Sequence, residues 1–257
     1  MGLQVGNGLQ RQKNAPFYQS TRKNSYFYEL DSTILQEVSN SPYLGLNFSH
    51  DLTWDVQIIN TLKKASSILG LIRRNFHHCP ASTRKAAYIS LVRSILEYGA
   101  TIWDPYTVTN INNLEKIQRQ AAKFITRDYK SRDPGCVTRM LQDLSLPPLQ
   151  QRRKNQRLIF MFKIVEGLVP AIPHYHFQPV GNKRRIIAKK FDNCETKNFV
   201  EHNQLRNSKC FVVCDSKTVI FKNSFFPKTI VEWNQLDEHL LTAPSLEAFR
   251  SRLQKSN

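Results

Sequence analysis

The chain has 257 residues, of which 40% are apolar, and its 37 Lys and Arg against 20 Asp and Glu give a formal net charge of +17 at pH 7. This length fits one large or two small domains with a packed core. No stretch approaches the roughly 18 consecutive apolar residues of a membrane-spanning helix, and the polar N-terminus lacks the apolar segment of a secretory signal. We therefore expect a nuclear or cytoplasmic protein, neither secreted nor membrane-bound, and the odd number of 5 cysteines favours a reducing compartment.

The N-terminal part of the chain predicts short strands followed by a long helix. Residues 1–24 are polar, and we expect them to be poorly ordered. Residues 25–50 are rich in β-branched and aromatic side chains interrupted by turn residues, which predicts two or three short strands forming a β-hairpin. From Trp54 to Ile72 the apolar residues recur at steps of three and four, which predicts one amphipathic helix.

Four further helices are predicted up to residue 170. The second begins at Ser82 or Thr83 as N-cap and ends near Trp103, and the third covers about 110–129. A short helix over 137–144 and a fifth over about 149–167 follow. The predicted buried face of the second helix consists of Tyr88, Leu91, Val92, Ile95, Tyr98 and Ile102, with Trp103 packing at the turn.

The C-terminal part is predicted to be mixed. Residues 171–204 are irregular and contain the basic run KRRIIAKK at 183–190, which fits a nuclear-localisation signal, a phosphate-binding loop or an exposed loop. Residues 209–226 predict a strand pair, and 228–240 and 245–253 predict two short helices, the last capped by Ser245. The fold class is therefore mainly α with small β elements: a β-hairpin at 25–50, a helical domain at 51–170, and a C-terminal region at 171–257 with a basic loop, a β-hairpin and two short helices.

Basic residues are concentrated on the predicted helices. Between residues 111 and 163 there are 12 Lys and Arg against four acids. Like charges four residues apart on a helix repel, and nucleic-acid phosphates relieve that repulsion and release counterions, although a charge run can also be a solvated face. The candidate nucleic-acid-binding residues are Lys63, Lys64, Arg73, Arg74, Lys116, Arg119, Lys123, Arg127, Lys130, Arg152, Arg153, Lys154 and Arg157.

No catalytic or metal-binding set emerges from the sequence. Glu97 and Asp104 would lie roughly 10 Å apart along a helix, and Pro105 pushes Asp104 out of the helical conformation, so a catalytic pair is not expected. There is no adjacent Asp pair and no phosphate-binding glycine loop. Residues 194, 202, 210 and 214 are Cys, His, Cys and Cys, but their spacing matches no common zinc module. We expect no catalytic residue, no metal and no cofactor.

Several stretches together resemble a known family. YLGLNFSHDLTW, LKKASSILGLIRRNFHHCP, YISLVRSILEYGATIWDPYTVTNINNLEKIQRQAAKFIT and SFFPKTIVEWNQL follow one another in order. They resemble the C-terminal region of LINE-type (non-LTR) retrotransposon reverse transcriptases over about residues 20–254. The resemblance implies that Tyr43, Leu44 and Gly45 belong to the primer-grip hairpin. It also implies that the following helices form a polymerase thumb, which holds the template–primer duplex by its backbone.

The chain departs from this family where catalysis resides. The Phe/Tyr-Ala-Asp-Asp turn, whose carboxylates hold Mg²⁺ in the intact family enzyme, does not occur in the sequence. The resemblance therefore implies a truncated reverse-transcriptase-like protein that is not an enzyme. Its expected partners are RNA, DNA or an RNA–DNA duplex, bound independently of sequence. The alternatives are a helical structural or protein-interaction module without a nucleic-acid role, and an unrecognised nuclease.

Overall fold

The chain divides into two compact units, Met1–Ile59 and Asn60–Asn257. The computed structural model describes residues 29–30, 33–34, 38–170, 179, 209–213 and 215–256. The predictions for residues 1–24 and for the basic run at 183–190 lie outside the described residues.

The first unit contains two small antiparallel sheets. Strand β1 (Glu29–Leu30) pairs with β2 (Thr33–Ile34), and β3 (Asn40–Tyr43) pairs with β4 (Leu46–Ser49). Leu44 and Gly45 connect β3 to β4 with φ angles of 48° and 78°, as tight hairpin turns require. The predicted N-terminal β-hairpin is therefore confirmed.

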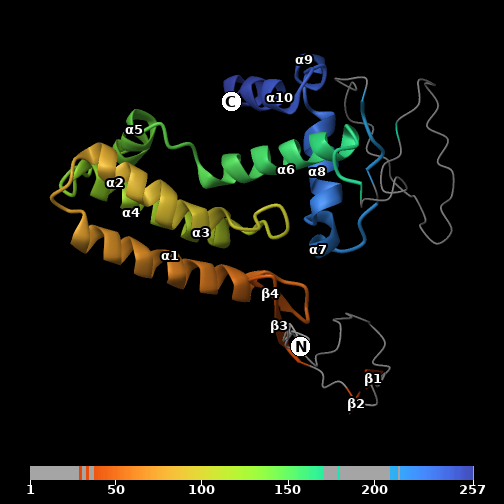
Figure 1. The fold of residues 1–257 in the computed structure, drawn as a ribbon, viewed down its shortest axis with the longest axis horizontal. Coiled ribbons are helices and arrows are strands. Elements are labelled where there is room, and N and C mark those ends of the chain that lie inside the picture. Colours follow the sequence, from red (N-terminus) through yellow and green to blue (C-terminus); the bar gives the residue numbers. More distant parts are fainter. Residues whose placement is uncertain are drawn as a thin grey trace, which may run out of the picture. The chain divides into compact units, whose positions relative to one another are not determined.

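The second unit is helical, as Figure 1 shows. Helix α1, which begins in the first unit, is followed by three consecutive segments and then by three longer helices. Their bounds are Asp55–Asn75 (α1), Ala81–Ala87 (α2), Tyr88–Arg93 (the π-helical segment η1), Ser94–Glu97 (α3), Val108–Thr126 (α4), Cys136–Asp143 (α5) and Leu149–Val165 (α6). The C-terminal helices are Val219–Lys222 (α7), Phe225–Asn234 (α8), Glu238–Leu241 (α9) and Leu246–Lys255 (α10). The mostly helical fold class is confirmed.

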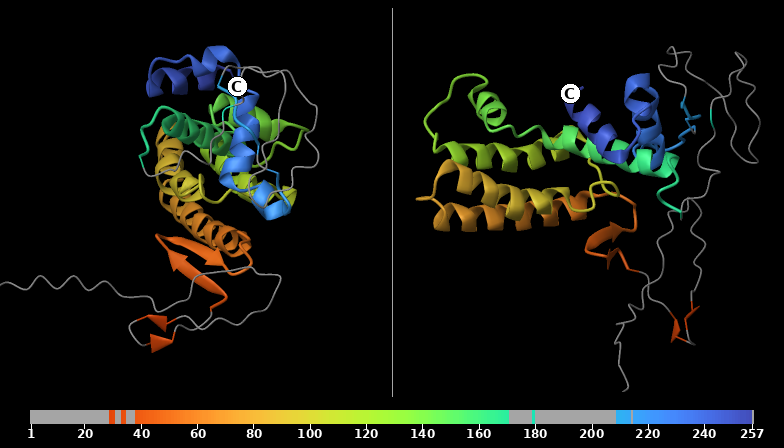
Figure 2. Two further views of the ribbon diagram at one scale, coloured as in Figure 1. Left: turned by 90° about the vertical axis from the view of Figure 1, so that its right-hand side faces the viewer. Right: turned by 45° about the horizontal axis from the view of Figure 1, so that its top comes forward.

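Helix α4 lies at the centre of the packing. It contacts α2, α5 and α6, and α6 in turn contacts α8 and α10. Figures 1 and 2 both show α2 and α4 side by side. Thr107 caps α4 by accepting a hydrogen bond from the backbone N–H of Asn110, which satisfies one of the N-terminal donors that have no partner within the helix.

The second predicted helix contains a π-helical turn, and its buried face differs from the prediction. Leu91, Tyr98 and Ile102 are 45%, 56% and 54% exposed, whereas Leu96 is buried. The error has two causes. The π turn of η1 adds a residue to the helical repeat and changes the phase of the residues after it. The helix also ends at Glu97, not near Trp103 as predicted, so Tyr98 and Ile102 lie in the turns that follow it. Within η1 and α3 the buried residues are Tyr88, Val92 and Leu96. The N-cap prediction is also wrong, because the helix starts at Ala81 after Pro80.

A buried polar pair joins η1 to α4. The Tyr88 hydroxyl donates to Gln118 Oε1 at 2.9 Å, and Gln118 Nε2 donates to the Pro147 carbonyl at 2.9 Å. Burial raises the pKa of the Tyr88 hydroxyl above its ordinary value of 10. Tyr88 therefore remains neutral in the folded chain at pH values where an unfolded chain ionises it.

This difference in the Tyr88 pKa between the folded and the unfolded chain predicts that the fold becomes less stable at alkaline pH. Above pH of about 10 the unfolded state loses the Tyr88 proton and the folded state keeps it, so the free energy of unfolding falls by about 1.4 kcal/mol per pH unit. The advantage of the wild type over Tyr88→Phe, about 1 kcal/mol near neutral pH, should shrink as pH rises above 10. Urea unfolding of both proteins across this range measures it, and a constant difference would contradict the assignment.

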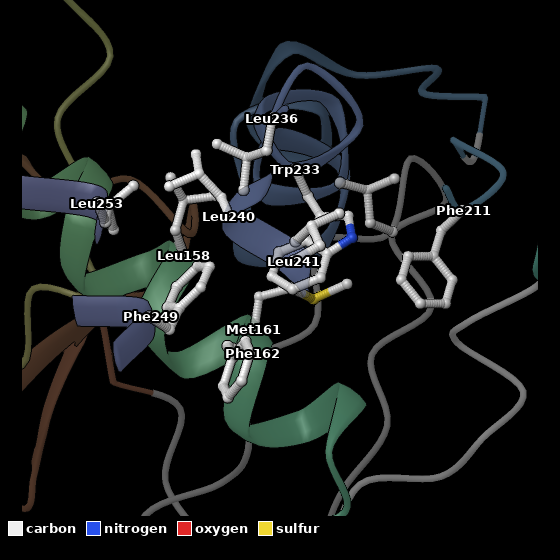
Figure 3. Packing of buried hydrophobic residues seen from close by; sticks show 11 residues of the cluster. Leu158, Met161, Phe162, Phe211, Trp233, Leu236, Leu240, Leu241, Phe249 and Leu253 are labelled. Atoms are coloured by element: carbon white, nitrogen blue, oxygen red, sulfur yellow. The ribbon is translucent and has the colours of Figure 1, made fainter. Parts of the chain in front are cut away.

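The C-terminal helices share a hydrophobic core with α6. Helix α6 contributes Leu158, Met161 and Phe162, and Phe162 stacks on Phe249 of α10 with ring centroids 4.4 Å apart. Trp233 of α8 is buried in this cluster, and its Nε1 donates to the Lys209 carbonyl at 2.9 Å (Figure 3). The cap predicted at Ser245 is confirmed, because its hydroxyl accepts from the Ala248 N–H at 3.1 Å.

Two predictions for the C-terminal region are wrong. The second half of the predicted strand pair is helix α7, because the Thr218 hydroxyl accepts from the Phe221 N–H and starts a helical turn. In the first half, Phe211 makes a single β-bridge with Pro179. A short apolar run does not separate strand from helix by its pattern alone. The helix predicted over 228–240 is divided into α8 and α9.

Candidate nucleic-acid interface

The cations of α4 lie on the side of the helix that faces away from the core. Leu114, Ile117, Ala121, Ala122, Phe124 and Ile125 are buried. Lys116 and Arg119 are exposed, and Lys123 is half-buried. We call Lys116, Arg119 and Lys123 the α4 stripe. Glu115 beside it is turned inward, because its carboxylate accepts from the Gln150 N–H at 3.0 Å at the start of α6.

The predicted continuation of this helix to residue 129 is wrong. Helix α4 ends at Thr126, and Arg127 adopts a left-handed conformation with φ 61°. The Asp128 carboxylate accepts from the N–H groups of Lys130 and Ser131 at 3.0 and 2.9 Å, and such local bonds compete with helix continuation. Arg127 and Lys130 are exposed but stand beyond the helix, and Arg127 donates to the His77 carbonyl.

The predicted cations of α1 are exposed as well. Lys63 and Lys64 lie in the middle of the helix, and Arg73 and Arg74 lie in its last turn. The Arg73 guanidinium stands 5.7 Å from the centre of the Tyr129 ring. The end of α1 therefore meets the turn that follows α4, and the cations of both segments gather there.

Arg84 reinforces this junction, and the sequence analysis gave it no role. Its side chain is 4% exposed. Nε and Nη2 donate to the Ile125 carbonyl at 3.1 and 2.5 Å, and Nη1 donates to the Cys79 carbonyl at 2.8 Å. Carbonyls at a helix C-terminus lack partners within the helix and attract cations. The only sequence signal is that Arg84 precedes the apolar Ala87 and Tyr88 by three and four residues, which places it on their face of the helix.

Arg153 and Arg157 of α6 are buried, which corrects their prediction as nucleic-acid contacts. They are 1% and 3% exposed. The Arg153 guanidinium lies 4.2 Å from the Trp103 ring centre and donates to the Leu96 and Trp103 carbonyls. Burial lowers the Arg153 pKa to about 10. A phosphate outside the protein does not reach either guanidinium, and both serve packing.

Arg157 is the centre of a network of charges. Nη1 pairs with Asp104, and Nη2 pairs with both oxygens of Glu232 in α8 at 2.7 and 2.8 Å. Lys228 of α8 also pairs with Asp104. We call Asp104, Arg157, Lys228 and Glu232 the charge network. It joins the α3–α4 connection, α6 and α8 through side chains that are 3–22% exposed.

Arg152 pairs with Glu97 and is only 30% exposed. Its Nη2 donates to Glu97 Oε2 at 2.9 Å, and this bond raises the Arg152 pKa. Lys154 is half-buried. Glu97 and Asp104 are thus each held by a different arginine of α6. Of the α6 cations predicted to bind nucleic acid, Lys154 alone is neither fully buried nor in an ion pair found in the described part of the chain.

Tyr43, Leu44 and Gly45, the primer-grip-like residues, stand together in the first unit. They form the tip of the β3–β4 hairpin, where Tyr43 and Leu44 are 64% and 74% exposed. Tyr43 packs edge-on against Phe48, and Phe48 packs edge-on against Trp54 with ring centroids 5.3 Å apart. A small cluster of aromatic side chains therefore supports the hairpin tip. Its role in holding a primer stays a prediction.

Among the residues that the structure describes, no group of three or more His, Cys, Asp and Glu side chains could hold a metal ion. Three of the four residues considered for zinc, at 194, 202 and 214, lie outside the described residues. Cys210 is buried. Within the described ranges, no helix is long and apolar enough to cross a membrane.

The described chain is thus a mostly helical protein with cations exposed on α1 and α4. It is 27% identical over 101 residues to a Drosophila melanogaster protein named "Probable RNA-directed DNA polymerase from transposon BS". This match covers 38% of the chain and 11% of that protein. It supports a reverse-transcriptase-like region within the chain. No family model matches the sequence, and no solved structure matches it.

Proposed function

We propose that this chain binds the backbone of RNA, DNA or an RNA–DNA duplex without reading sequence, in the manner of the thumb of a LINE-type reverse transcriptase. The α4 stripe carries the proposal, because it presents Lys116, Arg119 and Lys123 on one side of a helix whose other side is packed. The partial similarity to a transposon RNA-directed DNA polymerase supports the same partner class. In this proposal Tyr43, Leu44 and Gly45 approach the primer, and the chain supplies no nucleotidyl transfer of its own.

The spacing of the stripe suits a phosphate backbone. Positions 116, 119 and 123 follow one another at steps of three and four, so their side chains lie above one another along the helix. A protein that neutralises phosphates releases counterions, and its affinity then falls steeply with salt. The Glu115 carboxylate accepts a hydrogen bond from the start of α6, and it also interacts electrostatically with Arg119.

Replacing Lys116, Arg119 and Lys123 together by Gln should weaken duplex binding at least about tenfold at low salt. Each lost phosphate contact should also reduce the slope of log affinity against log salt by about 0.9. Fluorescence anisotropy with a labelled RNA–DNA duplex over a salt series measures both quantities. The fold should persist, because these side chains lie outside the core.

A matched control removes the same charge elsewhere. Lys222, Arg250 and Lys255 are exposed on α7 and α10, and their replacement by Gln also lowers the net charge by three. We expect this control to keep most of the affinity and of the salt dependence. Equal losses in both triple variants would mean that net charge alone is responsible. If neither the wild type nor the two variants bind the duplex at low salt, the protein-interaction alternative is favoured.

A further inference from the structure

Tyr129 is an aromatic side chain exposed within a group of cations. Its side chain is 50% exposed, and the Arg73 guanidinium from the last turn of α1 lies 5.7 Å from its ring centre. A guanidinium at this distance holds the ring by a cation–π contact. The ring therefore contacts α1 through Arg73 while a large part of its surface stays accessible to solvent.

The surroundings of this ring are strongly basic. Arg74, Arg127 and Lys130 are all exposed around the same junction of α1 and α4. The adjacent acid, Asp128, is turned back on its own turn, where it accepts from the N–H groups of Lys130 and Ser131. Cations at the end of a helix are also expected from its dipole. That explains Arg73 and Arg74, but it does not explain an exposed tyrosine ring beside Arg73.

We propose that Tyr129, backed by Arg73, is a stacking platform for an unpaired nucleobase at the end of the α4 stripe. This inference rests on the proposed function and specifies its partner as nucleic acid with a single-stranded extension beside a duplex. Base–aromatic stacking tolerates any sequence because every base has a π face. Arg127 and Lys130 supply the charge that the phosphates flanking such a base require.

The test compares two labelled RNA–DNA duplexes that differ only in a short single-stranded extension. The full chain should bind the extended duplex more tightly than the blunt one by about five- to hundredfold, the range that stacking of one base gives. Tyr129→Leu should abolish this preference and leave blunt-duplex affinity unchanged, so blunt binding reports that the variant is folded. Tyr129→Phe keeps the ring and should keep the preference.

Four results separate the possible failures. Equal affinity of the wild type for blunt and extended duplexes overturns the stacking platform and leaves backbone binding intact. A Tyr129→Phe variant as impaired as Tyr129→Leu overturns it too, because the hydroxyl would then be responsible. No binding of either duplex at low salt overturns the platform together with the proposed function. Similar preferences with thymidine and adenosine extensions support stacking, whereas a preference confined to one base contradicts it.

Discussion

Arg157→Met should destabilise the folded chain by about 3–5 kcal/mol, the usual cost of removing one partner from a buried ion pair. Arg157 is 3% exposed. Without it, Asp104 keeps only its ion pair with Lys228, and Glu232 loses its bidentate ion pair. Methionine preserves most of the volume of the side chain, so the loss reports on the charge. The midpoint and slope of urea unfolding at neutral pH measure the effect.

Two further variants test the explanation. In the background of Arg157→Met, Glu232→Gln removes the carboxylate that has lost its partner and should recover a large part of the loss, because the penalty is that of an uncompensated, mostly buried charge. Lys154→Met on the same helix should change stability by no more than about 0.5 kcal/mol. If Arg157→Met instead weakened nucleic-acid binding and left stability unchanged, its assignment to the charge network would be wrong.

The cations of α4 and α6 show where the sequence predicted the candidate interface correctly and where it did not. The α4 cations could be placed outward, because Leu114, Ile117 and Ala121 mark the opposite face through their spacing. The α6 cations could not be placed by charge alone. Arg153 and Arg157 lie in register with Leu149 and Met161 at steps of four, so they share the buried face. Their acceptors come from Leu96, Trp103, Asp104 and Glu232, which are distant in sequence.

The sequence predicted the long helices of the fold correctly but not where the helices end. Long periodic segments such as α1 and α4 gave the correct helices, because each displays a full apolar stripe. The ends of the helices are set by individual hydrogen bonds that the apolar periodicity does not show, as at Asp128 after α4 and Thr218 before α7. The π-helical segment η1 is a further case, because it changes the phase of a helix without changing its composition. The end of this helix was also missed. The predicted helix through 82–103 places Ile102 inside, whereas the helix ends at Glu97 and Ile102 is exposed in the turn that follows.

The end of the helix at Glu97 gives the second large prediction, which compares two neighbouring residues beyond it. Trp103→Ala should destabilise the chain by about 3–5 kcal/mol, as removal of a fully buried tryptophan does. Trp103 is 0% exposed, lies under the Arg153 guanidinium, and donates from Nε1 to the Tyr98 carbonyl at 2.7 Å. Ile102→Ala should change stability by only about 0.5 kcal/mol or less, because Ile102 is 54% exposed. Urea unfolding measures both variants.

The pair discriminates between the helix expected from sequence, which continues to Trp103, and a helix that ends at Glu97. A regular helix buries Ile102, and its truncation would then cost about 2–5 kcal/mol. Trp103→Phe adds a third point, because it keeps a ring under Arg153 and loses the hydrogen bond to Tyr98. Trp103→Phe should lower the free energy of unfolding by less than Trp103→Ala does, because the phenyl ring keeps part of the packing. If Ile102→Ala proved as damaging as Trp103→Ala, the buried face would follow the unbroken helical period, and the end of the helix at Glu97 would be refuted.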